Sequence, residues 1–368
     1  MTTPRAFFTL LMAPLAALAL PIASTADATR AEAVDALFAP PLIKAGAPGA
    51  AVLVIQDGRK VVSKGYGLAR LKTEAPITPT TVFELDSCSK QFTAMAVMIL
   101  AERGKLSYDD KLTKFFPEFP GWGARITVAH LLHHTGGLPD YFDAYDKTSK
   151  EGVPTSKLML HLIEKKKKPL FAPGAKYDYS NSGYMALAQI VERASGRKFP
   201  EFVRENIFEP LGMKQSLVYD ETKPRIINRA HCYDKEGDKY EDTSTDDLSC
   251  IYGDGSVRTT LNDLFLWDQA LYTEKLVHKA TIDKAFTSGK TNDGEETGYG
   301  FGWEVSRFRG ARMVSHTGLW LDFNTYIMRV PEKHLTVMVL SVRSKFPADT
   351  LGDKIAAICL SGKARAKP

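Results

Sequence analysis

The sequence predicts an α/β fold in which strands from both ends of the chain build a sheet around a mainly helical middle part. Apolar residues at 50–55 and 61–66 flank a turn at Asp57 and Gly58, which is the pattern of a β-hairpin. From 104 to about 292, helical patterns are joined by loops rich in Pro and Gly, with no internal repeat. Strand patterns then return. Such a layout leaves a cleft between the sheet and the helical part, where a ligand can bind.

The C-terminal part of the chain predicts four strands followed by one helix. The strand patterns cover 299–305, 311–319, 323–330 and 334–342, and the helical pattern covers 348–360. We expect a single domain over 29–368. Its α/β part is about 29–95 and 293–368, and its helical part is about 96–292.

Length and composition are those of an ordinary globular protein. At 368 residues with 44% hydrophobic content, the chain is long enough to bury a substantial core. The formal charge of +5 is modest for this length, and nothing suggests binding to nucleic acid. The lysine run 165–168 is most simply a solvated helix end, because basic residues complement the negative end of the helix dipole. Contact with an anionic polymer of the cell envelope is the alternative for this run.

The first 28 residues have the pattern of a secretory signal peptide. Arg5 precedes an apolar stretch over 6–20, and residues 26–28 supply small side chains around a cleavage point. The stretch is too short to span a membrane comfortably, and an uncleaved anchor is the alternative. We therefore expect a mature protein that begins near Thr29, is periplasmic or secreted, and has no stable membrane span.

Four cysteines are few for a scaffold that depends on disulfides. Cys88 and Cys359 fall in apolar helical patterns and are predicted to be buried thiols. Cys232 and Cys250 flank a polar, acid-rich stretch at 233–247 that predicts an exposed hairpin or loop. In an oxidising compartment these two cysteines can form a disulfide or remain thiols, and the sequence leaves both outcomes open.

A serine and a lysine three positions apart, Ser87 and Lys90, stand at the start of an apolar helix predicted over 91–103. A second such pair occurs at 195–198, but Ser195 closes a helix that ends at a glycine. Ser87 instead lies where free backbone N–H groups and the positive end of the helix dipole favour a developing negative charge. Lys90 can take the hydroxyl proton if burial lowers its pKa. An ordinary helix start is the alternative.

Two further groups of residues could complete a hydrolytic site. Tyr179 and Asn181 form the only Y-x-N in the chain, and a phenol can relay protons while an amide can bind a substrate carbonyl. His316, Thr317 and Gly318 lie in a predicted strand, where the glycine would let a substrate backbone approach and the strand edge could pair with an extended peptide. Turn, capping or structural roles are the alternatives for each.

A metal site is not expected. His130 and His134 have the i, i+4 spacing of zinc ligands, but there is no H-E-x-x-H and no partner carboxylate is marked. A second H-T-G, at 134–136, is followed by Gly137 and Pro139 and predicts a loop. We expect no metal and no cofactor.

In this order, Ser87 with Lys90, Tyr179 with Asn181, and His316 with Thr317 and Gly318 resemble the motifs of the serine β-lactamase and penicillin-binding protein superfamily. The chain looks most like the branch that holds class C β-lactamases, DD-peptidases, D-aminopeptidases and esterases, where the middle motif is Tyr-x-Asn. Further stretches also match: 128–141, 171–184, 210–213, 253–267 and 298–303. The resemblance implies an antiparallel sheet flanked by N- and C-terminal helices, plus a mainly helical sub-domain.

The resemblance also implies a role for each matched residue. Ser87 would attack a carbonyl, Lys90 and Tyr179 would share the proton transfers, and Asn181 would hold the substrate amide. The backbone N–H groups of Ser87 and Leu319 would form the oxyanion hole. His316 stands where many members have lysine. A histidine is mostly neutral near pH 7, so efficient hydrolysis of β-lactams becomes less expected.

The predicted function is an extracytoplasmic serine hydrolase that forms an acyl-enzyme on Ser87 and cleaves an amide or ester. Its substrate would be a small molecule or a peptide, possibly one containing a D-amino acid. The alternatives are a penicillin-binding sensor that deacylates slowly and a β-lactamase of the class C type. A non-catalytic scaffold is disfavoured, because all the polar catalytic positions are occupied.

Overall fold

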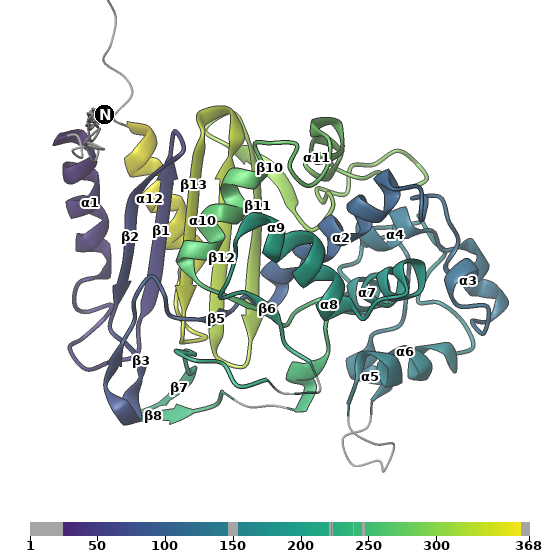
Figure 1. Cartoon of the computed structure of the whole chain (residues 1–368), viewed down its shortest axis with the longest axis horizontal. Helices are drawn as coiled ribbons and strands as arrows, with labels where there is room; N and C mark the ends of the chain where they lie inside the picture. The colour runs from purple at the N-terminus through teal and green to yellow at the C-terminus, as the bar shows by residue number, and fades with distance from the viewer. Residues whose placement is uncertain are drawn as a thin grey trace, which may run out of the picture.

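A computed structural model gives the fold of the chain (Figure 1). It describes residues 25–361 except 146–153, 221, 223, 238, 245 and 246. Residues 1–24, which hold most of the predicted signal peptide, lie outside the described part. The first described element is α1 (Thr25–Phe38), so the predicted cleavage point at 26–28 falls within a helix. Within the described ranges, no helix is both long and apolar enough to span a membrane.

The framework of the fold is a six-stranded sheet in which every pair of neighbouring strands is antiparallel. Strands from the two ends of the chain meet where β13 pairs with β1, with Ala50 opposite Ser341 and Gln56 opposite Leu335. The predicted fold class is thus confirmed. In spatial order the strands are β10 (Glu304–Phe308), β11 (Ala311–Trp320), β12 (Phe323–Val330), β13 (Leu335–Ser341), β1 (Ala50–Gln56) and β2 (Arg59–Tyr66).

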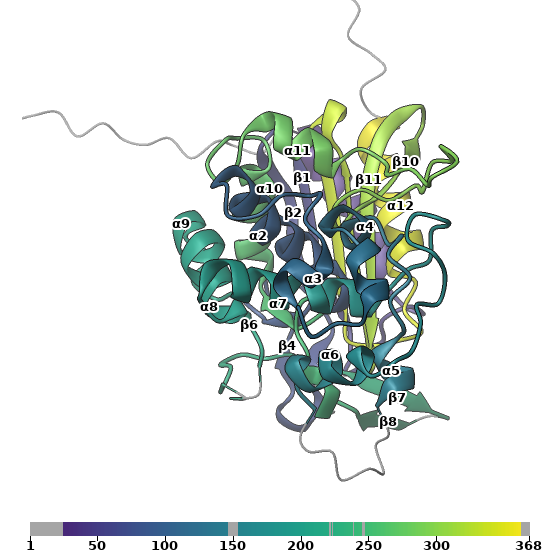
Figure 2. The ribbon, with the colours of Figure 1, turned by 90° about the vertical axis from the view of Figure 1, so that its right-hand side faces the viewer.

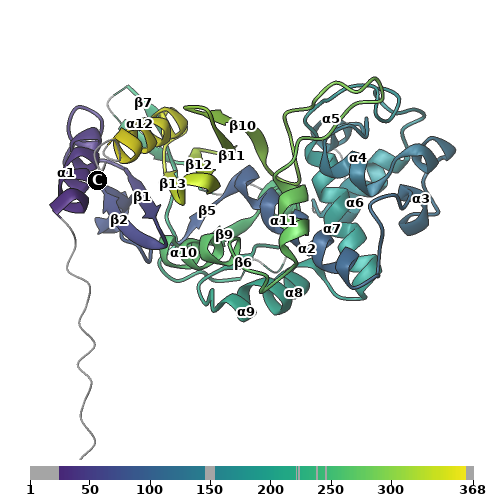
Figure 3. The same ribbon diagram turned by 90° about the horizontal axis from the view of Figure 1, so that it is seen from above.

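Both faces of the central strands are covered by helices. In β1, Val52 and Val54 point towards α1 and α12 (Ala348–Ser361), while Leu53 and Ile55 point into the larger core on the opposite face. Figure 3 shows α12 on one side of the sheet and α10 (Leu261–Ala270) on the other. Because successive side chains of a strand alternate between faces, burial on both faces explains why β1 is a nearly continuous apolar run.

A second, mainly helical part lies beside the sheet, and Figure 2 shows it from its outer side. Its longest helices, α2 and α7, pack against each other and carry Lys90 and Asn181 on their first turns. The helices of this part are α2 (Lys90–Glu102), α3 (Leu112–Phe115), α4 (Val128–Leu132), α5 (Tyr141–Ala144), α6 (Ser156–Glu164), α7 (Asn181–Ser195), α8 (Phe199–Val203) and α9 (Glu209–Leu211). The predicted limits of the helical part, 96–292, also enclose α10 and α11 (Lys279–Ala285), and α10 packs against β1.

The described residues also form short strands outside the six-stranded sheet. The hairpin of β7 and β8 lies in the acid-rich stretch where an exposed hairpin or loop was predicted. The small strands are β3 (Leu68–Arg70), β4 (Ala75–Pro76), β5 (Phe83–Glu84), β6 (Leu217–Val218), β7 (Tyr233–Glu236), β8 (Lys239–Asp242) and β9 (Val257–Thr259). Of these, β5, β9 and β6 form a three-stranded sheet, and β5 lies immediately before the turn that carries Ser87.

The predicted strand over 299–305 is wrong. Tyr299 forms only an isolated bridge with Glu304, and the strand begins at Glu304. Three glycines at 298, 300 and 302 explain the difference, because Gly298 and Gly302 have φ values of 69° and 76°, outside the range of a strand. A Cβ on Gly302 would lie 2.7 Å from Lys90 O, so this glycine also lets the segment approach α2 closely.

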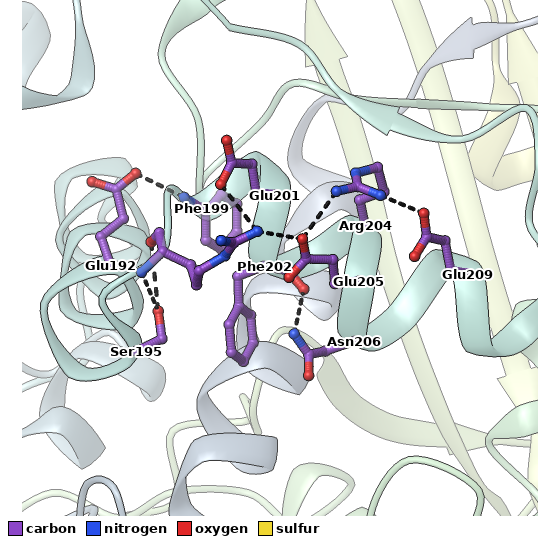
Figure 4. A network of polar contacts seen from close by, with 10 residues as sticks. Glu192, Ser195, Phe199, Glu201, Phe202, Arg204, Glu205, Asn206 and Glu209 are labelled. Carbon is purple, nitrogen blue, oxygen red and sulfur yellow. Dashed lines mark hydrogen bonds and ion pairs between the residues drawn. The ribbon is translucent and has the colours of Figure 1, made fainter.

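The second serine and lysine pair lies at a helix end, as predicted. Ser195 ends α7, and Gly196 follows it in the left-handed conformation with φ of 72°. Ser195 Oγ accepts a hydrogen bond of 3.1 Å from the backbone N–H of Arg197. Arg197 in turn belongs to an exposed network of ion pairs that runs along α8 to Glu209 (Figure 4). Ser195 therefore has a structural environment typical of a surface turn.

The four cysteines are all buried thiols. The prediction for Cys88 and Cys359 is confirmed, and the disulfide between Cys232 and Cys250 that the sequence allowed is not formed. Helix α6 ends at Glu164, immediately before the lysine run, as a solvated helix end requires.

Candidate active site

Ser87 lies on a 3-10 turn, η2 (Asp86–Ser89), between β5 and α2. The predicted helix after Ser87 is present, with bounds Lys90–Glu102. Hydrogen bonds with two other segments of the chain hold this turn in place. Ser89 Oγ accepts a 3.0 Å hydrogen bond from the backbone N–H of Val257, and Thr325 Oγ1 on β12 donates one of 2.9 Å to Leu85 O. The nucleophile candidate is thus attached to the rigid sheet.

The structure explains the glycine at position 318 differently from the sequence prediction. A Cβ at this position would lie 2.4 Å from Leu85 O and 2.3 Å from Thr325 Oγ1. The missing side chain therefore lets β11 pack against the turn that carries Ser87. The backbone that approaches Gly318 closely is that of Leu85, whereas the sequence predicted that of a substrate.

Lys90 points its ammonium group at Ser87. Its Nζ lies 3.0 Å from Ser87 Oγ, 2.9 Å from Asn181 Oδ1 and 2.8 Å from Asp254 O. The amide and carbonyl oxygens can only accept hydrogen bonds, whereas a hydroxyl can also donate. A neutral Lys90 would therefore keep its two N–H bonds to Asn181 and Asp254 and turn its lone pair towards Ser87. This geometry is the one needed to take a proton from the serine.

Burial makes the neutral form of Lys90 accessible. Its side chain is fully buried, and this desolvation lowers its pKa from the ordinary lysine value to about 8, although the carboxyl of Asp254 acts in the opposite direction. About one molecule in ten would then have a neutral Lys90 at pH 7. Burial thus lowers the pKa of Lys90, as a lysine that takes the proton of Ser87 requires.

Tyr179 lies over the ammonium group of Lys90, whose Nζ is 4.8 Å from the centre of the tyrosine ring. Part of the residue remains accessible, because 38% of its surface is exposed. Desolvation of the phenol raises its pKa well above the usual value, and a hydrogen bond with Ser87 acts in the opposite direction. Tyr179 is therefore protonated at neutral pH and can donate a proton, while Lys90 is the more readily available base.

Asn181 is oriented by Lys90. Because its Oδ1 accepts from the lysine, its amide nitrogen is left as the donor on the other side. Asn181 also borders a pocket of about 250 Å³, next to Ser87, so its N–H groups can meet a substrate carbonyl there. This is the role that the family motif implied.

His316 is buried and both of its ring nitrogens have protein partners. Nδ1 lies 2.6 Å from Thr317 O, which can only accept, so Nδ1 carries the proton. Nε2 must then accept from the hydroxyl of Tyr299, at 2.8 Å. Burial lowers the pKa of His316 to about 3. His316 is therefore neutral at physiological pH and, in this structure, contacts Tyr299 instead of the pocket.

The remaining residues of the third motif lie on the rim of the site. Thr317 and Leu319 are exposed on β11, with 61% of Leu319 accessible, whereas Gly318 between them faces the Ser87 turn. Leu319 borders the same pocket as Ser87, as an oxyanion hole built from these two backbone N–H groups requires. The structure thus gathers Ser87, Lys90, Tyr179, Asn181 and Leu319, and gives His316, Thr317 and Gly318 supporting positions.

Residues for which the sequence predicted no role in the site also shape it. His134 was predicted to lie in a loop, and it does. Its buried ring lies with its centre 4.4 Å from that of Tyr179, tilted by 36°, and its Nδ1 accepts a hydrogen bond from the backbone N–H of Ser180. It therefore fixes the loop that carries Tyr179. Asp86 and Asp254 are buried acids that border the pocket. The second H-T-G was the available signal for His134, and nothing in the local sequence marked the two acids.

The other histidines of that region have structural partners. His130 Nδ1 accepts from the backbone N–H of Thr127 in a helix cap, and His133 Nδ1 lies 2.9 Å from Tyr299 O. In the part of the chain that the structure describes, no group of three His, Cys, Asp or Glu is placed to hold a metal ion.

Fold and site together have the features of one class of protein, the serine hydrolases in which a candidate nucleophile lies beside a buried lysine. A family model described as Beta-lactamase matches residues 34–360, and the chain belongs to this family. Membership in the superfamily that the three motifs indicated is thus confirmed.

Individual proteins that are similar to this chain have names that fit this family. The chain is 35% identical over 304 residues to "Penicillin-binding protein 4*" of Bacillus subtilis (strain 168), covering 79% of this chain and 67% of the relative. It is 26% identical over 305 residues to a "D-aminopeptidase" of Gluconobacter oxydans (strain 621H), covering 80% and 55%. The solved structure of an octameric penicillin-binding protein homologue from Pyrococcus abyssi matches with a TM-score of 0.76 at 30% identity, covering 85% and 74%. This chain spans only about half of the aminopeptidase, so the activity of that longer protein is not transferred by the likeness.

Proposed function

We propose that the protein is an acyl-transfer hydrolase that forms an ester intermediate on Ser87 and passes the acyl group to water. The observation that carries this proposal is the set of contacts around Lys90, which leave only Ser87 as a hydrogen-bond partner able to give up a proton. The substrate is an amide or ester whose carbonyl oxygen sits between the backbone N–H groups of Ser87 and Leu319.

The proposed reaction has two steps. Ser87 Oγ bonds to the substrate carbonyl carbon while its proton passes to Lys90, and the tetrahedral intermediate collapses as that proton is delivered, through Tyr179, to the leaving amine or alcohol. Water then attacks the ester carbonyl, gives one proton to the same pair of residues, and releases the acid as Ser87 regains its hydrogen. Tyr179 can relay this proton because its phenol is protonated at neutral pH and its ring lies over the ammonium group of Lys90.

The names of the relatives support a peptide-like substrate. One is called a penicillin-binding protein and another a D-aminopeptidase. We include a peptide or amide of a D-amino acid among the candidate substrates. The neutral His316 provides no fixed charge for a substrate carboxylate, which supports a peptidase or esterase over an efficient β-lactamase.

The direct test compares two serine variants that share the same local sequence pattern. Ser87→Ala should lower the hydrolysis of a nitrophenyl ester by at least about 1000-fold, because it removes the nucleophile. Ser195→Ala removes the serine of the second S-x-x-K pair and should leave the rate unchanged. If Ser87→Ala turned over the ester at the wild-type rate, the proposal would be wrong.

A slowly deacylating penicillin-binding protein is the second candidate. It is favoured by the high pKa of Tyr179, because no phenolate is then available to activate the water of the second step. Following the adduct with a penicillin by intact mass separates the two functions. A long-lived adduct supports the sensor, whereas rapid loss of the adduct excludes it.

We also propose that the mature protein acts outside the cytoplasm, on the basis of the apolar stretch at 6–20 after Arg5. Cleavage after Ala28 would remove Asp27, whose carboxylate pairs with Arg30 and Arg59. Cell fractionation combined with the intact mass of the exported protein tests this location. A cytoplasmic protein with the full N-terminal sequence would contradict it.

A further inference from the structure

His134 is a buried histidine that the proposed reaction does not use, and it packs against Tyr179. Only 1% of it is exposed, and its backbone has a φ of 58°, which is uncommon for residues other than glycine. Its ring lies among tyrosine rings, with centroid distances of 4.4 Å to Tyr179, 4.4 Å to Tyr299 and 5.0 Å to Tyr184. A residue held in such a backbone conformation next to a candidate site is an indication of function.

His134 anchors the chain on both sides of Tyr179. Its carbonyl oxygen accepts a 2.9 Å hydrogen bond from the backbone N–H of Asp178, and its Nδ1 accepts one of 3.0 Å from the backbone N–H of Ser180. The residues before and after Tyr179 are thus bonded to one residue, whose ring also contacts the ring of Tyr179. Two of these three contacts need the imidazole.

The imidazole of His134 is neutral. Because Nδ1 accepts a hydrogen bond from Ser180, Nε2 carries the proton of the neutral ring. Desolvation lowers the pKa of His134 well below its usual value, and the neighbouring Lys90, His316 and His133 act in the same direction, against the bond with Ser180. A neutral ring exerts no net charge on Lys90, so any influence of His134 on this lysine must come from position.

We propose that His134 is a positioning residue of the site, which holds Tyr179 over Lys90 and so keeps water away from the lysine. The centre of the Tyr179 ring lies 4.8 Å from Lys90 Nζ. Lys90 is fully buried and Tyr179 is partly exposed, so the tyrosine forms the boundary between the lysine and the solvent. The inference rests on the proposed function, in which a neutral Lys90 accepts the proton of Ser87.

Loss of the Tyr179 ring from this position should favour the charged form of Lys90. Desolvation is the largest cause of its lowered pKa of about 8, and water solvates an ammonium group better than the face of a phenol does. The titration midpoint of the lysine should therefore rise towards the ordinary value. The other titratable groups around Lys90 are kept in the test; they are Asp86, Cys88, Asp140, Tyr184, Asp254 and His316.

Two substitutions at position 134 separate the ring from the hydrogen bond. Asparagine carries Oδ1 at the same place in its side chain as histidine carries Nδ1, so His134→Asn removes the ring and keeps an acceptor for Ser180. His134→Gly removes both, and both new residues tolerate a positive φ. His130→Gly is the matched control, because Nδ1 of His130 also accepts from a backbone N–H, that of Thr127, at a helix start outside the site.

The titration of Lys90 is a readout that does not depend on catalysis. We would follow the NMR signal of its Cε against pH in protein that contains isotope-labelled lysine, assigned by its loss in Lys90→Met. His134→Asn should raise the midpoint by at least about 0.5 pH unit, His134→Gly should raise it further, and His130→Gly should leave it unchanged. In a Tyr179→Ala background, His134→Asn should cause no further shift, because its effect passes through the tyrosine.

An unchanged Lys90 midpoint in His134→Asn, the milder variant, would overturn the inference. An equal shift with and without Tyr179 would also overturn it, because His134 would then act on the lysine by itself. The pH midpoint of kcat/KM for a nitrophenyl ester should move by the same amount as the NMR midpoint. If the wild-type protein hydrolysed no ester, the proposed function would fail, whereas the NMR titration would still decide the role of His134.

Discussion

At the scale of single residues, the chemistry depends on how burial sets the protonation states of a few groups. Lys90 is buried beside Ser87 with a pKa of about 8, and His316 is buried beside Tyr299 with a pKa of about 3. The first group can change charge within the working pH range of most enzymes, and the second cannot. Lys90 and His316 therefore make different contributions to the pH dependence.

The rate of acylation should rise with pH through a midpoint near 8. Lys90 must be neutral to accept the proton of Ser87, so protonation below this pKa should lower kcat/KM by about tenfold for each pH unit. His316 should add no second step between pH 5 and 7. The measurement is kcat/KM for a nitrophenyl ester from pH 5 to 9.5, and a single midpoint near 6.5 would contradict the assignment.

Replacing His316 should affect stability more than protonation chemistry. His316→Leu leaves the buried hydroxyl of Tyr299 without its acceptor, at a cost of about 1–3 kcal/mol in the free energy of unfolding. Thr317→Val, at the exposed neighbouring position, should change it by less than about 0.5 kcal/mol. Urea unfolding measures both, and a pH midpoint that moved with His316→Leu would argue for a direct role in catalysis.

The sequence was sufficient to identify residues whose place in a helix or strand indicates their role. Helix polarity alone separated Ser87 from Ser195, and the structure places the two serines as expected. The roles of Asp86, Asp254 and His134 in the site were missed for a physical reason. Their importance comes from burial and from contacts between distant segments, such as the bond from Lys90 to Asp254, which is 164 residues away.

At the scale of elements, glycines decide how closely the site segments pack. The strand β12 was predicted with its observed bounds, because a short, largely apolar run that ends at Pro331 is a local signal. The segment at 299–303 was predicted as a strand and is a bend, because Gly302 lies against the backbone of α2. A tertiary contact of this kind cannot be derived from the periodicity of the segment itself.

Gly318→Ala should separate β11 from the turn that carries Ser87. The new Cβ would meet Leu85 O, a backbone atom that cannot rotate away, so the strand or the turn must move. We expect a loss of about 1–3 kcal/mol in unfolding free energy, typical of overpacking, together with reduced ester hydrolysis. Gly121→Ala is the matched control, because its Cβ would meet nothing within 4 Å and its φ is negative. Equal stability and activity for the two variants would contradict this packing argument.

At the scale of the whole molecule, buried ion pairs join segments that come from different parts of the chain. Arg329 on β12 donates to Asp268 on α10 at 2.8 Å, and both side chains are almost fully buried. Thr336 on β13 donates to the same carboxylate at 2.6 Å. The sequence predicted that both ends of the chain share one sheet, but it could not place β13 beside β1, because such neighbours are set by long-range packing.

Asp268→Asn should therefore weaken the connection between α10 and the sheet. It leaves the charge of Arg329 buried without a counterion, which costs about 3–5 kcal/mol in the free energy of unfolding. Glu118→Gln removes one partner of an exposed pair with Arg193 and should cost at most about 1 kcal/mol. Chemical unfolding of both variants compares the two costs, and equal destabilisation would refute the role given to the buried pair.

The central claim is that Ser87 carries the acyl group. Intact mass spectrometry during turnover of a nitrophenyl ester, followed by peptide mapping, tests it most directly. The wild-type protein should gain the mass of one acyl group on the peptide that contains Ser87, and Ser87→Ala should gain none. An adduct on any other residue, or equal labelling of the Ser87→Ala protein, would contradict the claim.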